Sequence, residues 1–181
     1  MAAAASKLPR ANSLNPVLVQ TQVEIVRDGL VAVDSSHASS YTAAAEGYTK
    51  QLVKLDQDYK VGLTSCARRD IVASHTAFTY LAQQYSLSVT NITGISPEEE
   101  PSARALSEIA TIARVKNIRY IFFETLVSPK LAQTVASEIG AQTLVFNPLE
   151  GLTEEEMQAG KSYISVMREN LQNLRTALEC T

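Results

Sequence analysis

The chain lacks the features that mark several functional classes. Its 16 lysine and arginine residues are outnumbered by 19 aspartate and glutamate residues, which gives a formal net charge of −3. This balance leaves no basic field to attract nucleic acid or an anionic membrane surface. No apolar run approaches the roughly 20 residues of a membrane-spanning helix, and the N-terminus lacks the charged-then-apolar order of a signal peptide. We therefore expect a soluble protein with no nucleic-acid partner and no direct membrane insertion.

The motifs of common enzyme classes are also missing. The chain contains no Gly-x-Ser-x-Gly elbow and no glycine-rich phosphate loop, and its two histidines are His37 and His75. His37 lies at the start of a helical pattern, where we expect a solvated residue rather than a catalytic base. An enzyme therefore has little support from the sequence.

Cysteine is scarce. Cys66 and Cys180 are the two cysteines, and they have no Cys-x-x-Cys spacing, which argues against a zinc finger or a redox motif. They are either two buried thiols or one disulfide. A disulfide would close more than 100 residues into a loop and would stabilise the folded state by on the order of 4–5 kcal/mol in the chain-entropy model. It would also fit an oxidising compartment.

The length and composition indicate one ordinary globular domain. The chain has 181 residues, of which 45% are hydrophobic and 19% charged. Residues 1–15 show no periodicity, so we interpret them as a flexible leader or a remnant of cloning.

A helical segment is predicted over residues 16–63. Asn15 and Pro16 supply a helix cap and a proline at the first helical position, and apolar residues then recur every three or four positions to about Asp34. A second stripe of the same period runs from Ala38 to Tyr59 and predicts a helix of about 25 residues, roughly 37 Å long. A helix of this length before an α/β domain usually braces a structure or connects two lobes.

Strands alternate with helices in the region 64–181, which we predict to be an α/β lobe. The predicted strands and helices each share the apolar pattern of their class; the strands are residues 70–74, 88–93, 118–123 and 142–146, and the helices are residues 76–85, 102–116 and 129–139. This order predicts a four-stranded parallel sheet flanked by helices, a Rossmann-like lobe of three layers. A last helix is predicted to begin with a Thr153–Glu156 capping box and to continue through Leu178.

Polar residues follow the predicted strands, where ligands bind in open parallel sheets. His75 follows the first strand, Glu124 the third and Asn147 the fourth. One imidazole, one carboxylate and one amide make a plausible half of a zinc or manganese site. Two plainer interpretations stay open: His75 could only cap the next helix, and Glu124 could bond backbone amides or orient His75. The acidic run 98–100 is interpreted as a solvated loop.

Four segments together resemble a known family. They are Ser74-His75-Thr76-Ala77-Phe78, residues 94–102, Phe123-Glu124 with residues 128–132, and Asn147-Pro148-Leu149-Glu150-Gly151-Leu152. In this order and spacing, over residues 14–178, the chain resembles the C-terminal lobe of the zinc- and manganese-binding solute-binding proteins of ABC transporters.

The resemblance implies a metal site, and the sequence departs from the family at several positions of that site. The family has two lobes joined by a long rigid helix, with a metal ion held between them, and the resemblance implies that His75 is a metal ligand. The family's next ligand is a carboxylate whose position is taken by Asn147, a weaker neutral ligand. A further histidine and a tryptophan of the family fall at Ala11 and Ser13. The family's N-terminal lobe is absent, which implies a truncated or re-engineered chain with weakened metal affinity.

Two functions are expected from these observations. The first is a lobe that binds zinc or manganese, with His75, Glu124 and Asn147 as its site, and that serves an ABC permease outside the cytoplasmic membrane, in the periplasm or extracellularly. The second is a module that binds no metal and self-associates as a homodimer through the surface that the missing lobe would cover.

Overall fold

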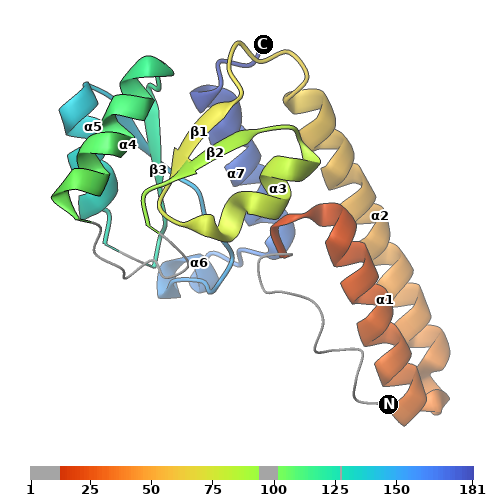
Figure 1. The fold of residues 1–181 in the computed structure, drawn as a ribbon. Coiled ribbons are helices and arrows are strands. Elements are labelled where there is room, and N and C mark those ends of the chain that lie inside the picture. Colours follow the sequence, from red (N-terminus) through yellow and green to blue (C-terminus); the bar gives the residue numbers. More distant parts are fainter. Residues whose placement is uncertain (1–12, 94–101, 127) are drawn as a thin grey trace.

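The structure is a computed structural model that describes residues 13–93, 102–126 and 128–181. Two antiparallel helices, α1 (Pro16–Val33) and α2 (Ala38–Gly62), form a hairpin that extends away from the α/β body (Figure 1). A short 3₁₀ turn, η3 (Ser35–His37), joins them. The side chain of Asn15 accepts a hydrogen bond from the backbone N–H of Val17, so the predicted cap is confirmed. Both predicted helices are confirmed, including the length of 25 residues for α2.

Four parallel strands make the predicted sheet. They are β1 (Asp70–Ala73), β2 (Ser88–Asn91), β3 (Tyr120–Phe123) and β4 (Gln142–Val145), in the order β2-β1-β3-β4. The remaining elements connect or follow these strands: η4 (Thr76–Phe78), α3 (Thr79–Gln84), α4 (Ala103–Val115), α5 (Lys130–Ile139), α6 (Glu154–Gln158) and α7 (Tyr163–Ala177). The fold class predicted from the alternation of strands and helices is confirmed.

The two faces of the sheet bury alternate residues of the strands. Ile71 and Phe122 belong to a core shared with α2, α3 and α7, whereas Val72 and Ile121 belong to a core shared with α4 and α5. Successive side chains of a strand point to opposite faces, so strands covered on both faces are continuously apolar. Figure 1 shows α4 and α5 on one side of the sheet and α2, α3 and α7 on the other. The result is a lobe of three layers.

The prediction of one long last helix is wrong. The chain forms α6 and then α7, with a break between them at Gly160, whose φ of +66° is a left-handed conformation that favours glycine. Ser162 then caps α7, and its partner Ser165 completes a second capping box. The first capping box, Thr153 with Glu156, is confirmed at the start of α6.

A disulfide and a buried hydrogen bond fasten the C-terminal helix to the body. Cys66 and Cys180 form the disulfide, which decides between the two interpretations of these cysteines. The hydroxyl of Tyr59 on α2 donates to the backbone carbonyl of Met167 on α7 at 2.7 Å. The second half of α2 is therefore part of the core of the lobe.

The N-terminal end of the described chain is packed as well. Leu14 is buried in the same core as α2 and α7, and residues 1–12 lie outside the described residues. The division into leader, helical segment and lobe stays a prediction. Across the described ranges, no helix combines the length and apolar character that crossing a membrane requires.

Candidate metal centre

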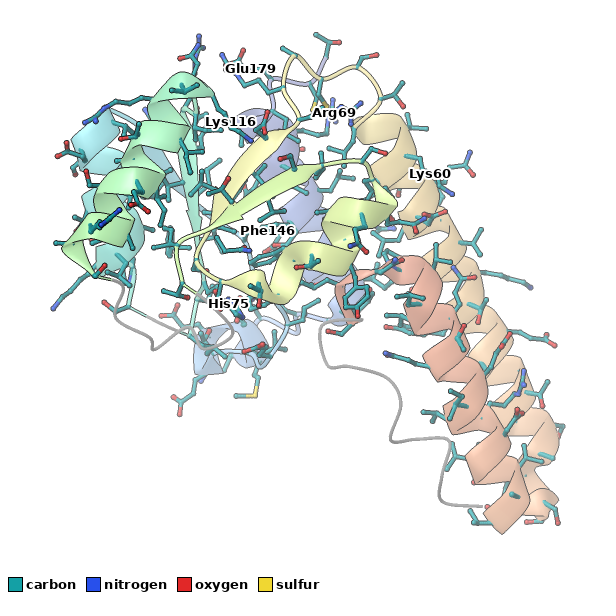
Figure 2. All side chains as sticks on the ribbon, viewed as in Figure 1. Lys60, Arg69, His75, Lys116, Phe146 and Glu179 are labelled. Atoms are coloured by element: carbon teal, nitrogen blue, oxygen red, sulfur yellow. A yellow bond between two sulfur atoms is a disulfide. The ribbon has the colours of Figure 1, made fainter. Side chains whose placement is uncertain are left out.

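His75 lies where two strands carry their polar residues to the same edge of the sheet. His75 follows β1, and β1 lies between β2 and β3 in the sheet. The connections that leave the two sides of β1 therefore run in opposite directions, and ligands bind at the carboxyl ends of strands at such a point. The register pairs Val72 with Ile121. Three residues further on, the same register brings His75 beside Glu124. Figure 2 shows His75 beyond the carboxyl end of β1.

Glu124 holds one nitrogen of the imidazole. His75 Nδ1 and Ser74 Oγ both hydrogen-bond to Glu124 Oε1. Both His75 and Glu124 are 2% exposed. The side chain of His75 makes no capping hydrogen bond to η4, so capping does not account for its position. The hypothesis that Glu124 orients His75 agrees with this contact. A carboxylate that accepts from Nδ1–H leaves Nε2 of a neutral imidazole free to bind a metal.

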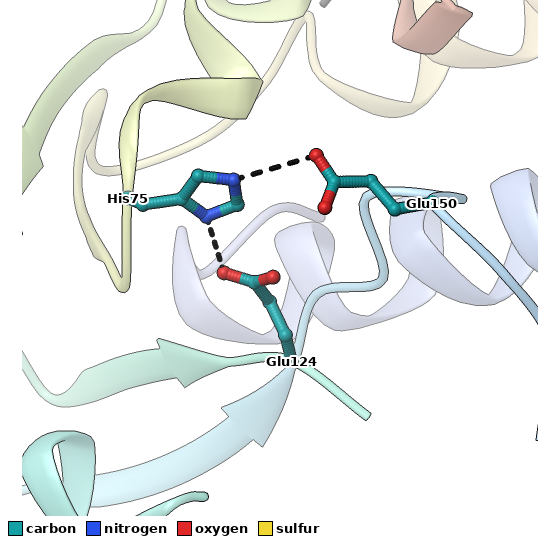
Figure 3. A group of neighbouring side chains, drawn as sticks. All are labelled: His75, Glu124 and Glu150. Atoms are coloured by element: carbon teal, nitrogen blue, oxygen red, sulfur yellow. Dashed lines mark hydrogen bonds and ion pairs between the residues drawn. The ribbon is translucent and has the colours of Figure 1, made fainter. Parts of the chain in front are cut away.

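The other imidazole nitrogen faces the carboxylate of Glu150, which was not among the predicted site residues. His75 Nε2 lies 3.7 Å from Glu150 Oε1, and the side chain of Glu150 is 52% exposed (Figure 3). One signal for this residue was available, because Glu150 is the carboxylate within the segment 147–152 that supports the family resemblance.

His75, Glu124 and Glu150 form a group that has the chemistry of a metal site. One ligand atom from each lies within 4.8 Å of the others. Imidazole nitrogen and carboxylate oxygen suit zinc, which takes such ligands at about 2.0–2.2 Å. Burial lowers the pKa of His75, but the hydrogen bond and charge of Glu124 and the charge of Glu150 outweigh it, so the pKa is raised above 6.5. The pocket therefore favours a positive charge at this point.

Asn147 lies in the same region but has other contacts. Its Oδ1 accepts from the backbone N–H of Leu149 at 2.8 Å, and its Nδ2 lies 3.3 Å from both Thr125 Oγ1 and Glu156 Oε1. The assignment of Asn147 as a metal ligand stays a prediction. Its contacts support that role less than the position of Glu150 opposite His75 supports Glu150 as a ligand. The acidic run 98–100 lies outside the described residues.

The family model and two of the relatives that match this chain are named for zinc uptake or zinc binding. The family model described as "Zinc-uptake complex component A periplasmic" matches residues 13–177. The high-affinity zinc uptake system protein ZnuA of Bacillus subtilis is 39% identical over 165 residues. The zinc-binding lipoprotein AdcA of Streptococcus pneumoniae is 41% identical over 162 residues.

Solved structures agree with these relatives. The Zn(II)-bound ZnuA-like domain of Streptococcus pneumoniae AdcA superposes with a TM-score of 0.79 at 40% identity, over 92% of this chain and 62% of that one. The laminin-binding protein Lbp of Streptococcus pyogenes superposes with a TM-score of 0.85 at 34% identity, over 94% of this chain and 65% of that one.

The coverage of the relatives is unequal. The matched regions take up about 90% of this chain, but 52% of Bacillus subtilis ZnuA and 32% of Streptococcus pneumoniae AdcA. The matched part contains the sheet, the α1–α2 hairpin and the group formed by His75, Glu124 and Glu150. The chain belongs to the family of the periplasmic component A of zinc-uptake complexes, a family of transport components rather than enzymes.

Proposed function

We propose that this chain binds Zn²⁺ through His75 Nε2 and the carboxylate of Glu150, with Glu124 orienting the imidazole. The observation that supports this most directly is the orientation of His75. One ring nitrogen is held by a buried carboxylate and the other faces a half-exposed carboxylate 3.7 Å away. Zinc is the first candidate ion because one relative is named a zinc uptake system protein and another a zinc-binding lipoprotein, and manganese is the second because the same ligand types suit it.

The affinity of this arrangement should be modest. Structural zinc sites have four protein ligands and catalytic ones three, whereas the residues that the structure describes offer two direct ligands and an orienting carboxylate. A site with fewer protein ligands binds zinc more weakly. We propose that the chain acts as one part of a two-lobed solute-binding protein that captures zinc for an ABC permease.

The compartment of this activity is proposed to lie outside the cytoplasmic membrane, periplasmic or extracellular. The family description contains the word periplasmic, and one relative is named a lipoprotein. The Cys66–Cys180 disulfide supports the same compartment because disulfides persist in oxidising environments.

A zinc titration of the metal-free chain by calorimetry tests the proposal. We expect saturable one-site binding in wild type, and a loss of at least tenfold in affinity for His75→Ala and for Glu150→Gln. His37→Ala is the matched control, since His37 is the other histidine and its side chain is 67% exposed on η3. Absence of binding to wild type, or equal effects of the two histidine substitutions, would overturn the proposal.

A self-associating module is the second candidate function, and one surface supports it. An apolar groove of about 410 Å³ runs between α1 and α2, lined mainly by Val19, Val23, Val26, Leu30, Tyr41 and Tyr48. Val26 is 61% exposed. Arg27 lines the groove and pairs with Asp28 of the same helix at 2.7 Å, and Glu24 lies one turn before it on α1. An antiparallel second copy would therefore place acidic and basic side chains of the two copies near each other at the rim of the groove. The proposed occupant is therefore a second copy of this chain.

Sedimentation equilibrium measures the oligomeric state and so tests this second candidate function. A dimer in wild type that Val26→Glu converts to a monomer would support it. Val61→Glu is the control, because Val61 is 68% exposed on α2 and is not among the residues that line the groove. A wild type that stays monomeric throughout the concentration range would exclude it.

A further inference from the structure

We propose that Asn147 is a positioning residue: its carboxamide fixes the loop that presents Glu150 to His75, and this role requires an amide rather than a carboxylate. The inference rests on the proposed zinc site and adds to it a residue that contacts no metal ion. It differs from the expectation that residue 147 is itself a ligand, and the two roles predict opposite results for one substitution.

The backbone of Asn147 is held from the C-terminal helix. Asn170 on α7 accepts a hydrogen bond from the Asn147 backbone N–H at 2.9 Å and donates from Nδ2 to the Asn147 carbonyl at 2.8 Å. Asn170 is 1% exposed, so these bonds are shielded from water. The point where the chain leaves β4 is therefore fixed relative to α7.

The side chain of Asn147 then sets the direction of the next three residues. Its Oδ1 accepts from the backbone N–H of Leu149 at 2.8 Å, which is the hydrogen bond of an Asx turn. Leu149 has a φ of +60°, a left-handed conformation that is costly for a side chain of this kind. The Asx turn offsets this cost, and Glu150 is the next residue in the chain. Loss of the turn would release Glu150 from its position opposite His75 Nε2.

The amide nitrogen of Asn147 connects this turn to the residues around Glu124. Asn147 Nδ2 lies 3.3 Å from Thr125 Oγ1, and Thr125 directly follows Glu124. The same nitrogen lies 3.3 Å from Glu156 Oε1. A single buried carboxamide thus connects the strand exit that holds Glu124 with the loop that presents Glu150. The two carboxylates that face His75 are fixed relative to each other by this contact.

Glu156 explains why an amide is needed at this position. Its Oε2 accepts from the Thr153 backbone N–H at 2.9 Å in the capping box of α6, and its Oε1 accepts from Asn147. Both Glu156 and Asn147 are buried. A carboxylate at residue 147 would lose the donor and place two negative charges in contact in a buried site. Lys161 Nζ, 3.7 Å from Glu156 Oε1, already pairs with Glu169 at 2.6 Å.

The decisive substitution is Asn147→Asp. If residue 147 is a direct ligand, the carboxylate should tighten zinc binding, because an anionic oxygen is a better zinc ligand than an amide oxygen. If residue 147 positions Glu150, the same substitution should weaken zinc binding at least tenfold. Adding Glu156→Gln to Asn147→Asp should restore most of the affinity. A glutamine keeps the capping box through its oxygen and offers its amide nitrogen to the new carboxylate.

The experiment is a zinc titration against a chromophoric chelator on the full chain, with thermal unfolding of each metal-free variant measured beside it. Asn173→Asp is the matched control, since Asn173 lines the same polar cavity but bonds the Val145 carbonyl instead of the Leu149 turn. Its affinity should stay within about threefold of wild type. Recovery of affinity in the double variant is the readout that general destabilisation would not produce.

Each outcome is informative. Affinity of Asn147→Asp at or above the wild-type level would overturn the positioning role while leaving the zinc site intact. Failure of wild type to bind zinc would overturn the proposed function, and the positioning role with it, before any variant of Asn147 is compared. If the single variant Asn147→Asp does not fold, the variant Asn147→Ser is measured in its place. A serine hydroxyl can accept from Leu149 but cannot also reach both Thr125 and Glu156, so unchanged affinity would again overturn the inference.

Discussion

The ring of Phe146 lies stacked on the ring of Phe78, with centroids 4.0 Å apart and planes inclined by 11°. Phe146 directly follows β4, and Phe78 ends η4, three residues after His75. Both side chains are fully buried. The contact therefore joins the core of the lobe to the turn that positions the candidate zinc ligand.

Removal of the Phe146 ring should destabilise the protein strongly. Phe146 also packs against Phe122, at a centroid distance of 5.1 Å, so the cavity left by Phe146→Ala would have apolar walls and could not fill with water. We expect the free energy of unfolding to fall by about 3–5 kcal/mol. Urea denaturation measures it, and Val33→Ala is the control because Val33 is 84% exposed. A loss for Phe146→Ala below about 1 kcal/mol would contradict the packing described.

Reduction of the disulfide should lower stability with little effect on the fold. Cys66 and Cys180 are separated by 114 positions, and backbone hydrogen bonds such as Arg68 N–H to the Leu178 carbonyl lie beside them. Loop-closure entropy for such a separation is worth on the order of 4–5 kcal/mol. The denaturation midpoint should fall on adding reductant, and the variant with both cysteines replaced by alanine should be insensitive to it. Equal midpoints for wild type with and without reductant would refute this.

The buried hydroxyl of Tyr59 should contribute a smaller amount. Tyr59→Phe removes the hydrogen bond to the Met167 carbonyl and preserves the stack on Tyr85, whose centroid is 4.8 Å away. We expect a loss of about 1 kcal/mol, the usual net value of one buried hydrogen bond. Comparison with Tyr80→Phe, which changes a less buried tyrosine on α3, separates this effect from a general effect of losing a hydroxyl. Identical unfolding curves for the two variants would argue against the role of the bond.

The strands and most helices were predictable because their apolar residues repeat with the period of the element. Val72 and Ile71 point to opposite faces yet are both buried, and this continuous apolar pattern is what marks a parallel strand. The break before α7 was not predicted. It depends on the left-handed Gly160 and on the Ser162–Ser165 box, which lacks the glutamate or glutamine of the common capping signature.

The candidate site was predictable in part for a related reason. His75 and Glu124 follow neighbouring strands, so sheet order alone brings them together. Glu150 reaches His75 only because Leu149 takes a left-handed conformation and because Asn170, 23 residues further along, holds the backbone of Asn147. A local sequence pattern does not contain such long-range contacts. The strand-end residue Asn147 was therefore predicted as a ligand in place of the carboxylate three positions later.

The metal-free protein and the zinc complex should respond to pH in opposite directions. Glu124 and Glu150 raise the pKa of His75 above 6.5 against the opposing effect of burial. A raised pKa in the folded state means that the stabilisation from the protonated imidazole is complete below the unfolded value of about 6.5 and is lost as pH rises through the folded value. The free energy of unfolding of the metal-free chain should therefore contain a component that decreases as pH rises above 6.5.

Zinc affinity should increase over the same interval, because the ion binds the neutral imidazole and must displace the proton. Urea denaturation in the presence of a chelator measures the stability of the metal-free chain, and a zinc titration measures the affinity. Both are carried out from pH 6 to 8. His75→Gln should remove this component of the stability slope, and it should abolish most zinc binding at every pH. A zinc affinity that falls with rising pH, or a stability slope that the substitution leaves unchanged, would show that His75 is not the group that couples protons to the metal.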